Sequence, residues 1–316
     1  MDWRQLWEVT STPDNVPIVL MMLLIPYFLW YGFREAVRND RLISQLEADP
    51  ALAKTHHRKS FPFHPAWDKV LHTWPYLLRV EFLAALIVTA FLMLWAVYFD
   101  APLEEPANPM LTMNPAKAPW YFLGLQELLV YFDPWIAGVL LPGFIIVGLM
   151  AVPYLDRNPK GNGYFTFNER KAEITIFLFG FVVLWCSLIV LGTFLRGPNW
   201  NFFGPFEYWD THKLEALTNV NLSQYIWMRG LRIGMPTFWL TREIFGILLV
   251  LAYVFVLPVV LARTAFKKYY EKLGPGRYYV GAFLFLMMMS LPAKMLMRWV
   301  FNLKYIVAIP EIFFNI

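Results

Sequence analysis

The stretch from residue 114 to 135, NPAKAPWYFLGLQELLVYFDPW, lies between two long apolar segments of the chain. It is rich in aromatic residues, yet it contains two acidic residues, Glu127 and Asp133. It is too polar to cross a bilayer and too apolar for an ordinary surface loop. Pro119 suits the first turn of a helix, because its missing N–H would have no partner there. The residues WYFLGLQELLVYF are therefore predicted to form a short helix of about three turns.

One side of this predicted helix combines aromatic and apolar residues with a carboxylate, because Trp120, Leu123, Glu127 and Val130 recur at near-helical spacing. An aromatic anchor at a membrane interface would explain the tryptophan and tyrosines but not the acid. An apolar pocket with one carboxylate suits the oxidation of a quinol, whose flat ring must lose protons as its electrons leave. Glu127 is therefore the predicted proton acceptor of such a site.

The composition indicates an integral membrane protein. The chain has 316 residues, of which 58% are hydrophobic and only 16% charged, too few to cover a soluble domain of this size. We predict an all-α, polytopic membrane protein with about six transmembrane helices and the short interfacial helix. The predicted spans are 15–33, 80–99, 136–155, 173–195, 240–262 and 279–301.

Basic residues predict the orientation of these spans. They are concentrated in the segments that follow the first, third and fifth spans, whereas 114–135 contains only Lys117. Because basic loops stay on the cytoplasmic side, the N-terminus, the 114–135 stretch and the C-terminus are predicted to lie outside. The connector after the first span is predicted to be helical to about Leu52, and 197–239 to form an external cap.

Histidine and cysteine usage argues against a metal centre within the chain. A transmembrane b haem needs axial histidines at membrane depth, and all five histidines fall outside the predicted spans. They are His56, His57, His64, His72 and His212. Cys186 is the single cysteine, so a disulfide framework or a cysteine-ligated iron–sulfur cluster within this chain is excluded. No haem ligand, metal site or nucleic-acid-binding motif is expected here.

Charged residues near the span ends have two interpretations. Arg79 and Glu81 stand at the inner end of the second span, where they could form an ion pair or contribute to a quinone site. Lys294 and Arg298 are four residues apart near the outer end of the last span. Snorkelling to the interface, or contact with lipid headgroups, is the simplest interpretation for this pair.

Three motifs together resemble a known family. EEPANPMLTMNPAKAPWYF at 104–122, GVLLPGFIIVGLMAVPYLD at 138–156 and NERKAEITIFLFG at 168–180 resemble the C-terminal half of cytochrome b. They look closest to subunit IV of the cytochrome b/f complex. The resemblance covers roughly 70–196, so we divide the chain into an N-terminal helix with its connector (1–69), a cytochrome b C-terminal-like domain (70–196) and an extension with the cap and two more helices (197–316).

The resemblance implies a membrane subunit of a Rieske/cytochrome b-type quinol:cytochrome c oxidoreductase in the bacterial cytoplasmic membrane. Menaquinol or ubiquinol would bind on the outer face, against Pro119, Trp120, Tyr121 and Leu123. The expected partners are a haem-carrying subunit similar to the N-terminal half of cytochrome b, which would supply the b haem ligands, a Rieske-type iron–sulfur protein, c-type cytochromes and lipids. The complex would couple electron transfer to proton translocation.

The sequence departs from the family pattern at one position. The family motif is Pro-Glu-Trp-Tyr, and the aligned residues here are Ala118, Pro119, Trp120 and Tyr121. Pro119 cannot accept a proton, so we expect Glu127, two turns along the same helix, to take over this role. On the inner side, the family often places an acid near the start of the second span, and Arg79 and Glu81 are the nearest matches for a quinone-reduction site.

Two other functions remain open at this point. The chain could be a purely structural membrane subunit with a degenerate quinol site, and the loss of the motif glutamate favours this alternative. It could also be a secondary transporter, but that function predicts paired broken helices and an inverted repeat, which the sequence does not show.

Overall fold

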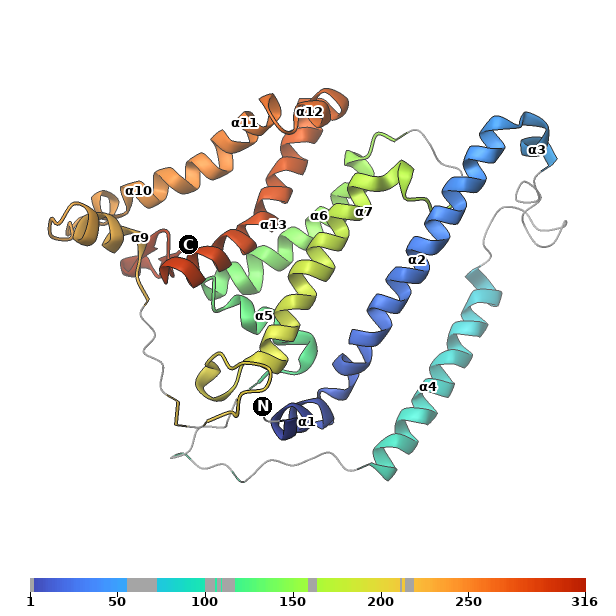
Figure 1. Ribbon diagram of the computed structural model, residues 1–316, viewed down its shortest axis with the longest axis horizontal. Coiled ribbons are helices and arrows are strands. Elements are labelled where there is room, and N and C mark those ends of the chain that lie inside the picture. Colours follow the sequence, from blue (N-terminus) through green and yellow to red (C-terminus); the bar gives the residue numbers. More distant parts are fainter. Residues whose placement is uncertain are drawn as a thin grey trace. The chain divides into compact units, whose positions relative to one another are not determined.

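The computed structural model describes residues 3–55, 73–99, 106, 109, 117–158, 164–210, 212–213 and 219–316. Within these residues the chain is mostly helical (Figure 1). In this part of the chain, six helices are long and apolar enough to cross a membrane: Val16–Ala48, Thr73–Tyr98, Ile136–Leu155, Asn168–Leu195, Trp239–Arg263 and Pro275–Phe301. The predicted all-α, multi-pass membrane fold is thereby confirmed.

The six spans contain the longer helical elements. The first is α2 (Val16–Ala48), and the second is α4 (Leu78–Tyr98) with a preceding turn. The rest comprise α6 (Leu141–Leu155), α7 (Lys171–Leu178), α8 (Ser187–Val190), α10 (Trp239–Leu251), α11 (Leu257–Arg263) and α13 (Pro275–Phe301). Wider π-type turns complete the third, fourth and fifth spans, and one of them, Leu191–Leu195, ends the fourth. Such turns retain backbone hydrogen bonding, which a helix in hydrocarbon requires.

Short helices connect the spans. They are α1 (Trp3–Ser11), α3 (Pro50–Thr55), α5 (Leu123–Leu128), α9 (Leu222–Gln224) and α12 (Lys267–Leu273). α2 and α3 together confirm that the connector after the first span is helical to about Leu52. α5 lies within the 114–135 stretch, where the short helix was predicted.

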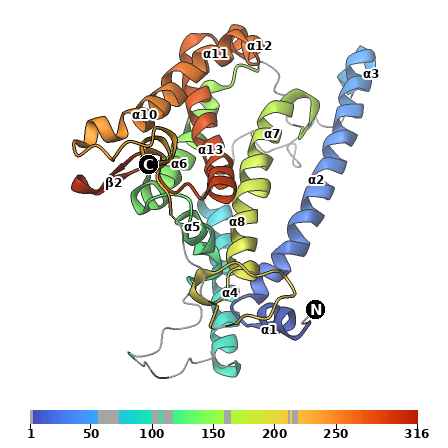
Figure 2. The ribbon, with the colours of Figure 1, turned by 60° about the vertical axis from the view of Figure 1, so that its left-hand side comes forward.

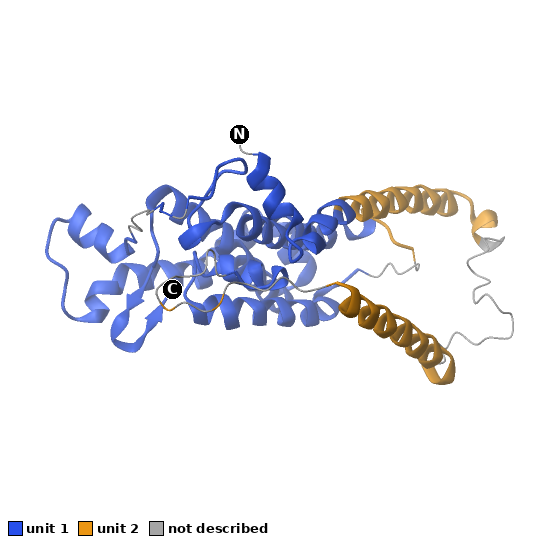
Figure 3. Cartoon of the chain, turned by 90° about the horizontal axis from the view of Figure 1, so that it is seen from below, with its two compact units in different colours: residues 1–25, 112–163, 169–316 blue, residues 26–111, 164–168 orange. Residues whose placement is uncertain are grey.

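The chain forms two compact units, shown in Figure 3. Unit 1 comprises residues 1–25, 112–163 and 169–316, and unit 2 comprises 26–111 and 164–168. Unit 1 therefore combines residues from all three segments of the predicted domain division. That division, which follows the extent of the family resemblance, stays a prediction.

The core of unit 1 joins α5 to three spans. Its buried residues come from α5 and the turn after it, from the start of the third span, from the fourth span and from α13: Leu128, Tyr131, Phe132, Ile136, Ala137, Leu184, Leu188, Leu291 and Met295. α13 also lies beside α6 (Figure 2). The C-terminal extension is thus packed against the segment that carries the candidate site.

A small β-hairpin ends the chain. Its strands β1 (Ala308–Ile309) and β2 (Phe314–Asn315) pair antiparallel, with Ala308 opposite Asn315. α13 ends at Phe301, and the next residue, Asn302, adopts a left-handed conformation (φ 53°), as does Phe313 in the hairpin turn (φ 54°). Asparagine tolerates this conformation and commonly terminates helices. The sequence analysis did not predict the hairpin.

Candidate functional site

A proline and a single helical turn lead into α5. Pro119 precedes a single 3₁₀ turn, Trp120–Phe122, and its carbonyl accepts the Phe122 N–H at 2.8 Å. The Gln126 side chain accepts the Ala118 N–H at 2.8 Å and so fixes the entry of the chain. α5 ends at Leu128, about one turn earlier than predicted, because the following residues form a looser turn.

Two glycines let α5 approach the C-terminal half of the fourth span. A Cβ on Gly124 would lie 3.2 Å from the Trp185 ring and 3.3 Å from Ile189. A Cβ on Gly192 would lie 3.4 Å from the Leu123 carbonyl oxygen. These contacts bury Leu123 and turn the Glu127 side of the helix toward the end of the span.

Glu127 is fully buried and holds both of its oxygens in hydrogen bonds. Arg196, directly after the fourth span, donates from Nε to Oε2 at 3.0 Å and from Nη2 to Oε1 at 2.8 Å. The Tyr131 hydroxyl donates to Oε1 at 3.0 Å. Arg196 also donates to the Trp200 carbonyl, which ties the cap to the pair. A bidentate pair of this kind compensates the cost of burying two charges.

The electrostatics of the cluster follow from burial and from the carboxylate. Burial raises the pKa of Tyr131, and the charge of Glu127 raises it further. Burial acts to lower the pKa of Arg196, but the hydrogen bonds and charge of Glu127 outweigh it, so this pKa is raised. Both groups therefore keep their protons, and Glu127 faces two permanent donors.

Lys117 joins this cluster from the segment before α5. Its Nζ donates to the Thr193 carbonyl at 2.8 Å and lies 4.5 Å from the centroid of the Trp209 ring. Burial lowers the pKa of Lys117 to about 7, against the opposing effect of Glu127. The fully buried Thr193 hydroxyl has no hydrogen-bond partner in the described part of the chain.

The structure places the predicted site residues in two groups. In unit 1, Leu123 is buried beside Glu127, Trp120 is partly buried, and Pro119 and Tyr121 are exposed. In unit 2, Arg79 and Glu81 are exposed residues in the first turns of α4.

Arg79 and Glu81 do not form the ion pair that the sequence analysis considered. Residues two apart on a helix point to different sides, so their charged groups cannot meet. Among the described residues no salt bridge joins them. Their assignment to a quinone-reduction site stays a prediction.

Lys294 does not snorkel, contrary to the simplest interpretation of the sequence. It is 3% exposed, donates to the Lys304 carbonyl at 2.6 Å and lies 5.7 Å from the Phe132 ring centroid. The polypeptide after α13 folds back over it and supplies the acceptor. Arg298 donates to the Asn302 carbonyl at 3.3 Å at the helix end.

A second set of contacts fixes the C-terminal hairpin to the segment after α5. Asp133 accepts hydrogen bonds from the Tyr305 hydroxyl at 3.1 Å and the Asn315 side chain at 3.3 Å. Trp135 donates to the Asn315 carbonyl and stacks on Phe314. Burial and the Asp133 contact raise the pKa of Tyr305 to about 12, so its hydroxyl remains a donor. The second acid of the 114–135 stretch therefore has a structural partner.

Glu243, on α10, is a buried acid that the sequence analysis missed. It is 1% exposed, accepts the Ala308 N–H at 3.1 Å and pairs with Arg242 at 3.2 Å. Arg242 also pairs with Glu311 in the hairpin at 2.9 Å. The signal was present in the sequence as adjacent opposite charges at the start of an apolar run.

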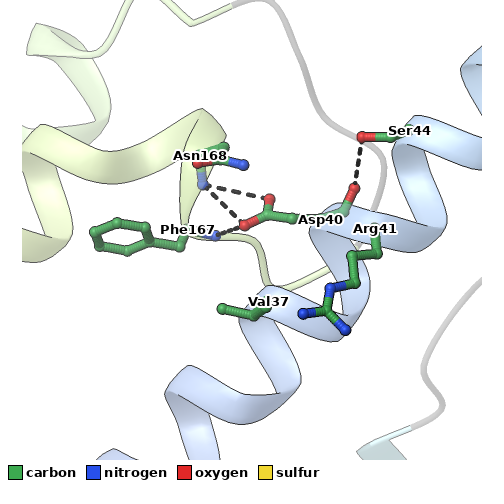
Figure 4. A pocket seen from close by; sticks show the side chains of 6 residues that line it. All are labelled: Val37, Asp40, Arg41, Ser44, Phe167 and Asn168. Atoms are coloured by element: carbon green, nitrogen blue, oxygen red, sulfur yellow. Dashed lines mark hydrogen bonds between the residues drawn. The ribbon is translucent and has the colours of Figure 1, made fainter.

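A separate pocket of about 290 Å³ lies in unit 2 (Figure 4). Its central acid, Asp40, accepts the backbone N–H groups of Phe167 and Asn168 at 3.2 to 3.3 Å. Carboxylates commonly satisfy free N–H groups where a helix begins. Asp40 therefore orders the start of the fourth span, and no catalytic arrangement accompanies it in the described residues.

Of the five histidines, the structure describes only His212. His212 is exposed beside Asp210, with 3.5 Å between Nδ1 and Oδ1. His56, His57, His64 and His72 lie outside the described residues. The expectation that b haem ligands come from another subunit stays a prediction.

Comparisons with known proteins bear on the segment around α5. Residues 106–205 match the family model for cytochrome b(C-terminal)/b6/petD. The cytochrome c subunit of menaquinol:cytochrome c reductase from Geobacillus thermodenitrificans is 31% identical over 116 residues, which cover 35% of this chain and 46% of that protein. The chain thus spans about half the length of this curated relative. No solved structure matches the chain.

The family match contains Lys117, α5, Glu127, Thr193 and Arg196, so it includes the whole buried cluster. It also includes the third and fourth spans, as the motifs in the sequence indicated. Over residues 106–205 the chain is thus similar to the cytochrome b(C-terminal)/b6/petD family.

Proposed function

We propose that this chain is a membrane subunit of a Rieske/cytochrome b-type quinol:cytochrome c oxidoreductase, and that the α5 segment forms part of its quinol-oxidation pocket. One observation carries the proposal. The segment that matches the cytochrome b family holds a short aromatic helix with a buried, fully hydrogen-bonded carboxylate. A charged side chain that is buried in a membrane protein is costly, and such residues commonly mark functional sites.

The chemistry of the segment suits a quinol. Trp120, Tyr121 and Leu123 offer flat and apolar contacts for its ring, and Pro119 shapes the start of the helix. Glu127 is the proposed carboxylate of the proton path. Because Arg196 and Tyr131 occupy its oxygens, Glu127 can take up a proton only when one of these hydrogen bonds opens.

The remaining parts of the complex are proposed from the family. The haem-carrying cytochrome b subunit would supply the b haem ligands, and a Rieske-type protein and c-type cytochromes would take the electrons. The relative from Geobacillus thermodenitrificans is named for menaquinol, which favours that quinol over ubiquinol. We place the chain in a bacterial cytoplasmic membrane with its N-terminus outside, and Arg79 and Glu81 at an inner quinone-reduction site.

One observation supports the alternative of a structural subunit with a degenerate quinol site. Pro119 replaces an acid, and Glu127 is held in an ion pair that by itself stabilises the cap on α5. In that case the segment would retain the fold of a quinol site without its chemistry.

A purified complex distinguishes these functions. The tagged chain is extracted from its native membrane with its partners, and quinol:cytochrome c activity is measured with and without a quinol-site inhibitor. We expect b haem absorbance, inhibitor-sensitive activity, and a lower rate in Glu127→Gln with the complex still assembled. An assembled complex whose haem spectrum does not respond to the inhibitor, and whose Glu127→Gln variant keeps the wild-type rate, would support the structural alternative.

A further inference from the structure

A quinol site needs a base that is free to gain and lose a proton. Oxidation breaks both hydroxyl O–H bonds, so two protons must leave while the electrons move to acceptors. Pro119 has no group that could take a proton. Glu127 has both oxygens engaged by Arg196 and Tyr131, and neither of those partners loses its proton readily.

Lys117 has the position that such a base requires. It stands two residues before Pro119 and three before Trp120, at the entry to the α5 segment. Its amine is directed toward the end of the fourth span, with one hydrogen bond to the Thr193 carbonyl. In the described residues no carboxylate lies within ion-pair distance of its Nζ, and the nearby Glu127 is itself paired with Arg196.

The surroundings of Lys117 are those of an incompletely satisfied polar site. The Trp209 ring covers one side of the amine at 4.5 Å. The neighbouring Thr193 hydroxyl is fully buried and unpartnered in the described part of the chain. Buried hydroxyls are rarely left without a partner, so this one marks a place where a further hydroxyl group would bond. The charged groups that face the amine belong to the cluster of Glu127, Arg196 and Tyr131.

We propose that Lys117 accepts one of the two protons that leave quinol in this protein, a role that rests on the proposed function. In this step one quinol O–H bond breaks and its proton joins the lone pair of the neutral amine, giving an ammonium group. The proton of the second O–H bond leaves by the path proposed for Glu127. The electrons pass to the metal-centred one-electron acceptors of the complex. The ammonium group then releases its proton to the outer aqueous phase.

Lys213, in the 197–239 cap, provides a matched control for Lys117. It also lies over an aromatic ring, that of Phe203 at 4.3 Å, and also donates to a backbone carbonyl. Unlike Lys117, it pairs with a carboxylate, Glu207, at 3.3 Å. Because its amine is already paired with this carboxylate, replacement of Lys213 by arginine should leave proton transfer unchanged.

The test measures quinol:cytochrome c activity of the purified complex from about pH 5.5 to 8.5 for wild type, Lys117→Arg, Lys117→Gln and Lys213→Arg. The wild-type rate should rise with pH to a plateau above about 7, falling about tenfold for each unit below that. Lys117→Arg retains a donor and a cation but has no base. The rate of Lys117→Arg should be lower by at least about tenfold and should no longer show the fall below about pH 7. The same is expected of Lys117→Gln. Lys213→Arg should match wild type.

Each outcome has a defined meaning. A Lys117→Arg complex with the wild-type rate and pH profile overturns the role of Lys117 while leaving the proposed function intact. The b haem content reports whether each variant assembles. If neither Lys117 variant assembles, a wild-type rate that does not fall below about pH 7 still overturns the role of Lys117. A wild-type complex that neither oxidises quinol nor binds the inhibitor overturns the proposed function as well.

Discussion

At the scale of residues, the Glu127–Arg196 pair is the most consequential contact in unit 1. Its side chains are 0% and 12% exposed, so removing one partner leaves a buried charge uncompensated. We expect Glu127→Ala or Arg196→Ala to lower the free energy of unfolding by about 3–5 kcal/mol. Thermal unfolding of the detergent-solubilised complex measures this loss.

The double variant Glu127→Gln/Arg196→Gln separates a structural role from a chemical one. Because it removes both charges together, it should recover much of the lost stability. If Glu127 belongs to the proton path, activity should stay low although stability returns. Recovery of both activity and stability would mean that Glu127 acts only as the partner of Arg196.

The lowered pKa of Lys117 also predicts how stability depends on pH. Between about pH 7 and 10.5 the unfolded chain holds a proton that the folded chain has released. The free energy of unfolding should therefore rise with pH across this window, and Lys117→Met should flatten the rise. Unfolding temperatures at several pH values check this. An equal pH slope in wild type and Lys117→Met, with Lys213→Met as control, would contradict it.

A single functional residue can be predicted from the sequence only where its side chain differs strongly in chemistry from its neighbours along the chain. Glu127 could be predicted because an acid in an aromatic helix is unusual. Its partner Arg196 is 69 residues away, and nothing local indicates that the two meet. The sequence indicates no role for Lys117, since its burial depends on Thr193 and Trp209, which tertiary packing brings to it.

At the scale of elements, length and apolar composition predicted the third to sixth spans to within about five residues at each end, because about 20 apolar residues have few alternatives in a membrane protein. The first helix continues to Ala48 and the second begins at Thr73, so their bounds were predicted less well. The length of α5 was overestimated, since helical spacing continues past Leu128 while the backbone does not. The C-terminal hairpin could not be predicted. Its two-residue strands carry no periodic pattern, and a buried glutamate on α10 holds them.

The contact between α10 and the hairpin depends on Gly246. A Cβ there would overlap the Ile306 carbonyl oxygen and lie 3.1 Å from the Val307 side chain. Gly246→Ala should displace the hairpin, break the hydrogen bond from Ala308 to Glu243 and lower the free energy of unfolding by about 1–3 kcal/mol. Thermal unfolding together with proteolysis of the hairpin detects both effects.

Gly143→Ala is the control for this substitution, because a Cβ on Gly143 in α6 has nothing within 4 Å. It should be neutral or stabilising by up to about 1 kcal/mol, since alanine suits a helix better than glycine. Equal effects of the two substitutions would show that helix propensity, and not the close approach of the hairpin, sets the result.

At the scale of the whole molecule, the family match ends near residue 205 but the packing does not. Leu291 and Met295 of α13 share a buried core with α5 and the fourth span, and Asp133 and Trp135 bind the terminal hairpin. The sequence analysis treated the extension after residue 197 as an addition. In the structure, the extension supports the segment that carries the candidate site.

The most direct measurement of the proposed quinol site is photolabelling of the purified complex with an azido-quinone, followed by mass spectrometry of this chain. The label should appear between Lys117 and Trp135, and excess quinol or a quinol-site inhibitor should suppress it. Label confined to other subunits, or label in this segment that neither competitor reduces, would contradict a quinol pocket walled by α5.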